Sequence, residues 1–220
     1  MRIAIFLYDG MTALDAIGPY DVLRQLPGAE VVFVGNTAGV KRTEEQPLGL
    51  VADRGLGEVP AADVLVVPGG FGQERVMREA RTLEWLRTIH ATTQWTTSVC
   101  TGSLILAAAG LLRGLRATTH WAFLEQLREF GAEPVAERVV EQGKIITAAG
   151  VSAGIDMALR LVARVGGDDL ARGIQLGIEY DPAPPFDAGS PRKAPAHVVQ
   201  LVRQAIELKR AQAQHAASGV

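Results

Sequence analysis

The fold is decided by the stretch WTTSVCTGSL at residues 95–104, which contains the only cysteine of the chain. Residues 95–99 are rich in β-branched side chains and predict a short strand that ends at Cys100. Small residues follow, and the run LILAAA at residues 104–109 predicts a helix that Gly110 closes as its C-cap. The cysteine is therefore expected in a sharp turn between a strand and a helix.

The neighbours of Cys100 predict a reactive cysteine. Ser98 and Gly102 flank it in the pattern S-x-C-x-G, which mimics the G-x-S-x-G elbow that holds a nucleophile in a strained turn above a sheet edge. The next helix points its amides and the positive end of its dipole at the sulfur, so we expect thiolate to be favoured over thiol. The alternative is an inert core cysteine, since free cysteine is among the most buried residue types. The strand, the small neighbours and the immediate helix favour the nucleophile.

Length and composition predict one globular domain over residues 1–220. Hydrophobic residues make up 48% of the chain and charged residues 21%, which is enough apolar material for a full core. The net charge of −2 gives no support for binding nucleic acid or an anionic membrane. A single cysteine excludes a disulfide framework and a thiolate-rich metal site. With no signal peptide and no apolar stretch near the ~20 residues of a membrane helix, a cytoplasmic protein is expected.

Strands alternate with helices along the chain. Apolar runs typical of buried parallel strands occupy residues 2–8, 29–35 and 63–68. Helical patterns occupy residues 12–26 (with Pro19 near a helix start), 74–94, 121–130, 152–165 and 195–213. Residues 139–147 predict a hairpin, and the proline-rich residues 181–191 predict an ordered extended loop. This order predicts an α/β protein with a doubly wound, mostly parallel sheet and helices on both faces.

Functional residues of such a sheet gather at the carboxyl ends of its strands. The sequence GGFG at residues 69–72 follows an apolar strand and lies at this edge. We expect the amides of Gly70 and Phe71, together with the amide of Thr101, to form an anion-stabilising pocket beside the sulfur. The alternative is a plain tight turn. Its position beside the cysteine strand favours the functional interpretation.

Asp15 and His120 are the candidate proton carriers. Asp15 lies in the apolar segment of residues 11–19, where an unpaired buried carboxylate is costly. It either caps a helix that begins near Pro19 or lies beside Cys100 as a proton carrier with a pKa raised by burial. His120 is a possible base or supporting residue, but a single histidine beside an aromatic residue is more often structural. The histidines lack the spacing of metal ligands, so no metal site is expected.

Several motifs together resemble the ThiJ/PfpI superfamily. They are LDAIGP at residues 14–19, PGGFG at 68–72, SVCTGS at 98–103, RATTHWA at 116–122, GVSAGID at 150–156 and the proline-rich segment at 179–191. The resemblance runs nearly from end to end, and the combination is most similar to the isocyanide hydratase branch. It implies a flavodoxin-like three-layer sandwich with the nucleophile elbow at the carboxyl end of a central strand, assembled as a homodimer.

Departures from other branches narrow the resemblance. Protease-like relatives carry histidine directly after the cysteine, where this chain has Thr101. Glyoxalase- and deglycase-like relatives use a glutamate near the end of the first strand, where this chain offers Asp15, a shorter acid. A ready-made cysteine–histidine pair is therefore absent from the motif.

The resemblance implies hydration of an isocyanide, R–N≡C, to an N-substituted formamide. Cys100 would attack the terminal carbon to form a covalent thioimidate, Asp15 would move protons, and Thr101 would orient water and support the sulfur. The substrate is a small molecule, no cofactor is required, and neither nucleic acid nor a membrane is expected as a partner. Two alternatives stay open: a glyoxalase- or deglycase-like enzyme for α-oxoaldehydes, and a non-enzymatic redox-sensing or partner-binding protein.

Overall fold

The computed structural model describes residues 1–44 and 48–218. Its strands are β1 (Arg2–Phe6), β2 (Glu30–Gly35), β3 (Gly39–Arg42), β4 (Gly49–Ala52), β5 (Arg54–Gly55), β6 (Val64–Val67), β7 (Trp95–Val99), β8 (Arg116–Ala117), β9 (Glu133–Pro134), β10 (Val139–Gln142) and β11 (Ile145–Ala148). Its helices are α1 (Ala13–Leu23), α2 (Gln73–Val76), α3 (Ala80–Thr92), α4 (Gly102–Ala108), α5 (Gln126–Glu129), α6 (Ala153–Gly166), α7 (Asp168–Gly177) and α8 (Ala196–Ser218), with 3₁₀ turns η1 (Leu56–Glu58) and η2 (Trp121–Phe123).

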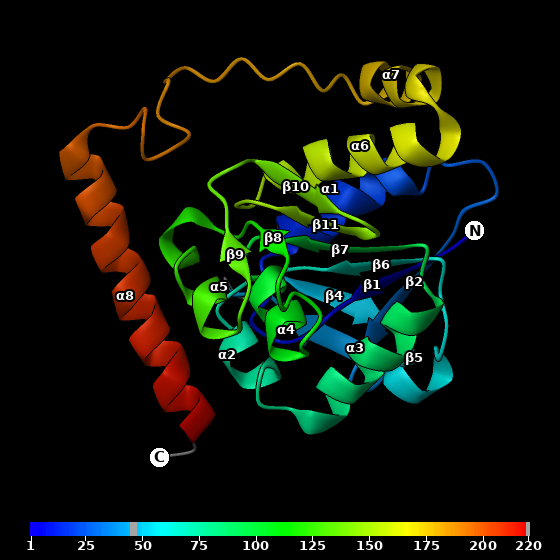
Figure 1. Cartoon of the computed structure of the whole chain (residues 1–220), viewed down its shortest axis with the longest axis horizontal. Helices are drawn as coiled ribbons and strands as arrows, with labels where there is room; N and C mark the ends of the chain where they lie inside the picture. The colour runs from blue at the N-terminus through cyan, green and yellow to red at the C-terminus, as the bar shows by residue number, and fades with distance from the viewer. Residues whose placement is uncertain (45–47, 219–220) are drawn as a thin grey trace.

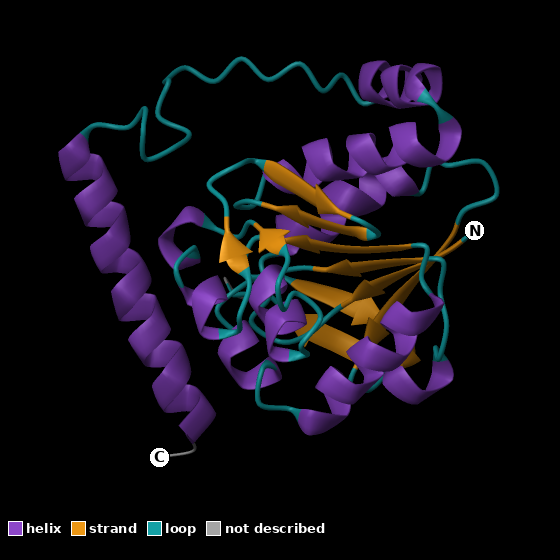
Figure 2. Cartoon of the chain, in the orientation of Figure 1, coloured by secondary structure: helices purple, strands orange, loops and turns teal. Residues whose placement is uncertain are grey.

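The central sheet is mostly parallel. Among the described residues it has seven strands in the order β10-β11-β7-β6-β1-β2-β5, and only β10 runs antiparallel to its neighbour. Helices α1 and α6 cover one face, and α3 and α4 cover the other (Figure 1; strands are orange in Figure 2). This arrangement confirms the predicted flavodoxin-like three-layer sandwich.

The core lies around β1 and β6, in the middle of the sheet. Residues 3–6 and 64–67 are fully buried, because helices cover these strands on both faces and their sequences are continuously apolar. Strand β7 pairs in parallel with β6, with Val67 opposite Ser98. The turn after β6 and the elbow after β7 therefore emerge side by side at one edge of the sheet.

Helices α1 and α6 pack closely because each presents a glycine to the other. A Cβ atom at Gly18 would lie 3.1 Å from Cγ1 of Ile155. A Cβ atom at Gly154 would lie 3.0 Å from Cγ2 of Val99 in β7 and 3.2 Å from Cγ of Pro19. Contacts this short are tighter than side chains normally tolerate, so the two glycines allow the helix backbones to approach. We call this contact the glycine notch.

Several predicted boundaries were wrong. Helix α1 begins at Ala13, so Pro19 lies inside it rather than near its start. The pattern at residues 74–94 divides into α2 and α3, and the pattern at 121–130 divides into η2 and α5. The hairpin at residues 139–147 is confirmed as β10 and β11, and residues 181–191 form no helix or strand, as predicted. Periodicity identified the elements, but the breaks follow local turns that periodicity does not encode.

Candidate functional site

Cys100 occupies a strained turn between β7 and α4. Its φ is 55°, a left-handed value that non-glycine residues rarely adopt. The conformation is held from both sides: the amide of Cys100 donates to the carbonyls of Ala148 and Ala149, at 3.1 and 2.9 Å, and its carbonyl accepts from the Thr119 hydroxyl at 2.9 Å. The predicted elbow is therefore present, with the surrounding structure imposing its backbone strain.

Gly102 explains the spacing in the S-x-C-x-G pattern. A Cβ atom at this position would lie only 2.1 Å from the carbonyl oxygen of Val67 in β6. Any larger residue would push the start of α4 away from the sheet. The glycine therefore allows the first turn of α4 to lie directly beneath Cys100.

Two backbone amides donate hydrogen bonds to the sulfur, from Thr101 and from Val151. The Thr101 amide was expected here, but Val151 was missed. Val151 has a φ of 25°, which is strained for a β-branched residue, and lies just before α6. The local sequence has no feature that predicts positive φ at a valine, so this contact becomes visible only in the folded chain.

Asp15 lies in the first turn of α1 and is fully buried. Its Oδ2 accepts a hydrogen bond of 2.9 Å from the amide of Gly69, its Oδ1 is buried with no hydrogen-bond partner among the described residues, and the nearby Cys100 thiol lowers its pKa. The capping interpretation was wrong, because the residue before α1 is Thr12. Burial raises the pKa of Asp15 from its ordinary 3.8 to about 7; the Gly69 amide opposes the shift and the charge of Glu44 adds to it.

The protonation of Cys100 differs from the expectation. Burial raises the pKa of the thiol well above its usual value, and the negative charges of Asp15 and Glu44 raise it further. The amides of Thr101 and Val151 lower it, but by less. The prediction that the helix dipole favours thiolate was therefore wrong for the free protein, because desolvation and the adjacent carboxylate outweigh one short helix. Near neutral pH the pair consists of a thiol and a carboxyl group close to half ionised.

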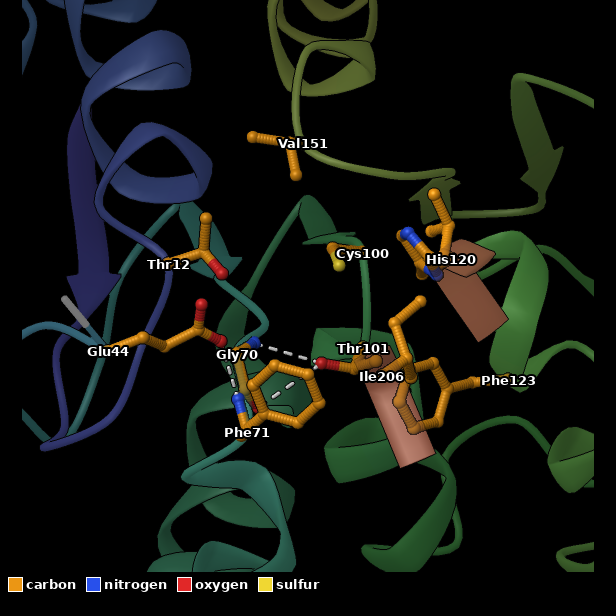
Figure 3. A pocket seen from close by; sticks show the side chains of 11 residues that line it. Thr12, Glu44, Gly70, Phe71, Cys100, Thr101, His120, Phe123, Val151 and Ile206 are labelled. Atoms are coloured by element: carbon orange, nitrogen blue, oxygen red, sulfur yellow. Dashed lines mark hydrogen bonds between the residues drawn. The ribbon is translucent and has the colours of Figure 1, made fainter. Parts of the chain in front are cut away.

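The predicted anion pocket at Gly70 and Phe71 is occupied by other groups of the chain. The Gly70 amide donates to the Thr101 hydroxyl at 2.9 Å, and the Phe71 amide donates to Oε1 of Glu44 at 2.7 Å (dashed lines in Figure 3). Both residues line the cavity, but their amides donate hydrogen bonds within the chain and thereby fix the loop. In this structure the two amides bind Thr101 and the Glu44 carboxylate, so their role toward a developing negative charge on a substrate stays a prediction. Glu44, which sequence reasoning missed, is a second carboxylate in the cavity wall.

His120 is a neutral residue of the cavity wall. Burial lowers its pKa, and its Nδ1 accepts a hydrogen bond of 3.3 Å from the amide of Ala122. With Nδ1 engaged as an acceptor, the neutral ring carries its proton on Nε2 and acts there as a donor. His120 therefore lines the same cavity as Cys100 in a supporting position and is not arranged as a base for the thiol.

Most of the groups described above line a cavity of about 290 Å³, whereas Asp15 is buried behind its wall. Cys100 and Thr101 lie in its wall, and Phe71 and Phe123 contribute aromatic rings (Figure 3). Ile206 also reaches it, from α8 near the end of the chain. A compact, largely apolar cavity with a few polar groups in its lining is the usual form of a small-molecule site.

Among the described residues, no group of three or more histidine, cysteine, aspartate or glutamate side chains is arranged to hold a metal ion. In the same part of the chain, no helix combines the length and the apolar character needed to span a membrane.

Comparison with known proteins gives consistent matches. A sequence model of the DJ-1/PfpI family matches residues 1–164. The isonitrile hydratase of Pseudomonas putida is 45% identical over 204 residues, which are 93% of this chain and 89% of that protein. A deglycase of Pyrococcus abyssi is 30% identical over 149 residues, which are 67% of this chain and 89% of that protein. The crystal structure of a ThiJ/PfpI family protein from Pseudomonas syringae has a TM-score of 0.92 and 38% identity, and covers 98% of this chain and 90% of its own.

Proposed function

The chain belongs to the DJ-1/PfpI family, and from that premise we propose that it hydrates isocyanides to N-substituted formamides with Cys100 as the nucleophile. The observation that carries the proposal is the pairing of Cys100, which lies in the wall of a small apolar cavity, with the fully buried carboxyl group of Asp15 behind it. The 45% identity to an isonitrile hydratase supports the choice of substrate class. A nucleophile beside an acid whose pKa lies near neutral pH is an arrangement suited to covalent hydration.

The first step adds the thiol across the isocyanide carbon. The Cys100 thiol gives its proton to the Asp15 carboxylate as the sulfur bonds to the terminal carbon. Asp15 then gives the proton to that same carbon, which yields the thioimidate Cys–S–CH=N–R. The carboxylate is regenerated, and the net change is the addition of S and H to one carbon. Because Asp15 has a pKa near 7, it serves as acceptor and donor at little cost in driving force.

The second step adds water and releases the product. Asp15 accepts a proton from water as the oxygen bonds to the thioimidate carbon, and passes this proton to the nitrogen. The tetrahedral adduct Cys–S–CH(OH)–NH–R then breaks its C–S bond. Its hydroxyl proton passes through Asp15 to the leaving sulfur, so N-substituted formamide and the free thiol are formed. The amides of Thr101 and Val151 stabilise the charge that develops on the sulfur.

A cysteine enzyme for α-oxoaldehydes is the second candidate, and the match to a deglycase supports it. There the thiol would add to the aldehyde carbon to give a hemithioacetal, and Asp15 would move the protons of the next steps. Direct turnover measurements separate the candidates, because an isocyanide and methylglyoxal give different products. Consumption of neither would favour the redox-sensing or partner-binding alternative.

The deciding experiment incubates the purified protein with cyclohexyl isocyanide and follows formation of N-cyclohexylformamide by mass spectrometry. We expect catalytic turnover by the wild type and none by Cys100→Ala. A parallel reaction with methylglyoxal reports the second candidate. Turnover of methylglyoxal alone, or of neither compound, would overturn the proposed function.

We also propose that the chain assembles as a homodimer. Val40 and Val51 face each other across the β3–β4 hairpin and are 54% and 56% exposed, and Leu14 on α1 is 42% exposed. Exposed apolar side chains of this kind suit a protein–protein contact. Light scattering on the eluting protein should give the mass of two chains, and Val40→Lys combined with Val51→Lys should shift it toward one.

A further inference from the structure

The C-terminal helix α8 contributes to the cavity that contains Cys100. Figure 1 shows this helix standing beside the three layers, joined to α7 by a long extended segment. Val202 and Ile206 lie one turn apart on α8, so their side chains share a face, and both line the cavity. Two side chains from the far end of the sequence therefore complete the site.

We propose that Val202 and Ile206 select the R group of the isocyanide, and that the site takes compact apolar R groups that pack against this face of α8. The inference rests on the proposed function, because it concerns the substrate of that reaction. It assigns two specificity-determining residues that take no part in bond making.

The shape of the substrate supports this role. An isocyanide is linear from its terminal carbon to the first atom of R, so R is directed away from the sulfur that attacks the carbon. The cavity walls away from the sulfur include the rings of Phe71 and Phe123, whose centroids lie 6.3 Å apart, and the side chains of Val202 and Ile206. These four side chains offer no hydrogen bond, so a polar group of R that packs against them would be desolvated without compensation. The polar side chains of the lining belong to other parts of the chain than α8 and are those of Thr12, Glu44, Thr101 and His120. The volume of about 290 Å³ lies at the lower end for ligand pockets and limits R to a compact group.

Specific contacts fix which face of α8 meets the cavity. Nε of Arg210 donates to Oε1 of Glu74 at 3.0 Å, and the Glu74 side chain is only 6% exposed. Arg203 directly follows Val202, and its guanidinium lies 4.8 Å from the centre of the Trp121 ring. Leu208, in contrast, is 67% exposed and does not line the cavity. The same helix thus provides both the test positions and a matched control.

The experiment compares methyl isocyanide with cyclohexyl isocyanide on the full chain. In Ile206→Trp, the added ring fills the cavity, so kcat/KM for cyclohexyl isocyanide should fall at least about tenfold, while methyl isocyanide should change less than about twofold. Ile206→Ala and Val202→Ala remove packing and should lower kcat/KM for cyclohexyl isocyanide about three- to tenfold. Leu208→Trp and Leu208→Ala should leave both substrates at the wild-type level. Equal losses for the two substrates, or the same losses in the Leu208 variants, would overturn the inference.

A second measurement keeps the test independent of turnover. Because the chain has a single cysteine, a maleimide reports on Cys100 alone. Ile206→Trp should slow labelling by N-cyclohexylmaleimide at least about fivefold relative to N-methylmaleimide, measured at the same pH, and Leu208→Trp should not. If the wild type hydrates neither isocyanide but Ile206→Trp still changes the labelling ratio, the proposed function is refuted. The role of α8 in selecting the R group is then retained. An unchanged labelling ratio would remove that role.

Discussion

The two sides of the cavity are built in different ways. The pair of Asp15 and Cys100 is buried in the layered core and held by backbone hydrogen bonds from three segments. The other side is formed by α8, a peripheral helix on which Leu201 and Leu208 are 61% and 67% exposed. A fixed centre suits chemistry that depends on sub-ångström placement, and a peripheral helix can vary without disturbing it. The comparison predicts that changes at the centre affect every substrate alike, while changes on α8 affect substrates by size.

The strongest test of the centre is Cys100→Ser. We expect a loss of at least about a thousandfold in kcat for small and large isocyanides alike, because a buried serine hydroxyl is a far weaker nucleophile and Asp15 cannot ionise it. Formamide production with methyl and cyclohexyl isocyanide measures the effect. A variant that retains a tenth of the wild-type kcat would exclude covalent catalysis at this residue.

Asp15→Asn should lower kcat by about 10²–10⁴-fold for both substrates, because the amide keeps the shape but cannot carry a proton. Asp21→Asn is the matched control, since Asp21 lies on the same helix with its side chain about half exposed. Steady-state rates under substrate saturation give the comparison. A loss in kcat below fivefold would mean that Asp15 has only a structural role. The distinction between a catalytic centre and a selective wall on α8 would then fail.

The same variant should be more stable than the wild type above neutral pH. The pKa of Asp15 is raised from 3.8 to about 7, so the folded chain binds more protons than the unfolded chain between these values. This contribution to the free energy of unfolding is fully present below pH 3.8 and is lost as pH rises to the folded-state pKa of about 7. The loss is about 1.4 kcal/mol per pH unit and about 4 kcal/mol in all. Thermal unfolding at pH 8 should show a higher Tm for Asp15→Asn, and the difference should shrink toward pH 4. An equal difference in Tm at pH 8 and pH 4 would contradict the conclusion that ionised Asp15 destabilises the folded chain.

The pH profile sharpens the comparison further. Asp15 must be ionised to accept the thiol proton, so kcat/KM should rise about tenfold per pH unit below 7 and level off above it. Ile206→Ala should keep this profile, because α8 carries no proton in the reaction. Rates from pH 5.5 to 8.5 measure both. A flat profile in the wild type, or a shifted one in the α8 variant, would show that the two sides are not separable.

The smallest expected effect concerns the attachment of α8. Glu74→Gln weakens the contact with Arg210 and should raise KM for cyclohexyl isocyanide about two- to fivefold, with kcat nearly unchanged, because only the bulky R group uses the helix. Glu84→Gln is the control, since Glu84 forms an exposed ion pair with Arg87. A fall in kcat with methyl isocyanide would mean that α8 also supports the catalytic centre.

The sequence predicts the centre of the molecule better than its rim. Strands that are buried on both faces carry continuous apolar runs, and the small residues around Cys100 have a direct steric cause in Gly102. The position of Asp15 beside the sulfur was one of two open interpretations, and its contact with Gly69 selects between them.

Other features had no signal in the sequence. Val151 joins the sulfur through a backbone amide, and a backbone contact leaves no trace in residue type. The protonation of Cys100 depends on burial and on Glu44, neither of which local sequence reports. In the sequence, Ile206 is one apolar residue of an amphipathic helix. The path of the extended segment before α8 brings it to the cavity.

The glycine notch between α1 and α6 bears on how such sites diversify. Helix α1 carries Asp15, and the Val151 amide lies just before α6, so the notch joins the two groups that meet the sulfur from outside its own strand. Their spacing depends on the helix pair and on the end of β7, because Gly154 packs against the Val99 side chain as closely as against Pro19. The Cys100 side chain takes no part in this contact, so a lineage can exchange the reacting atom while it keeps the arrangement of α1, α6 and Val99.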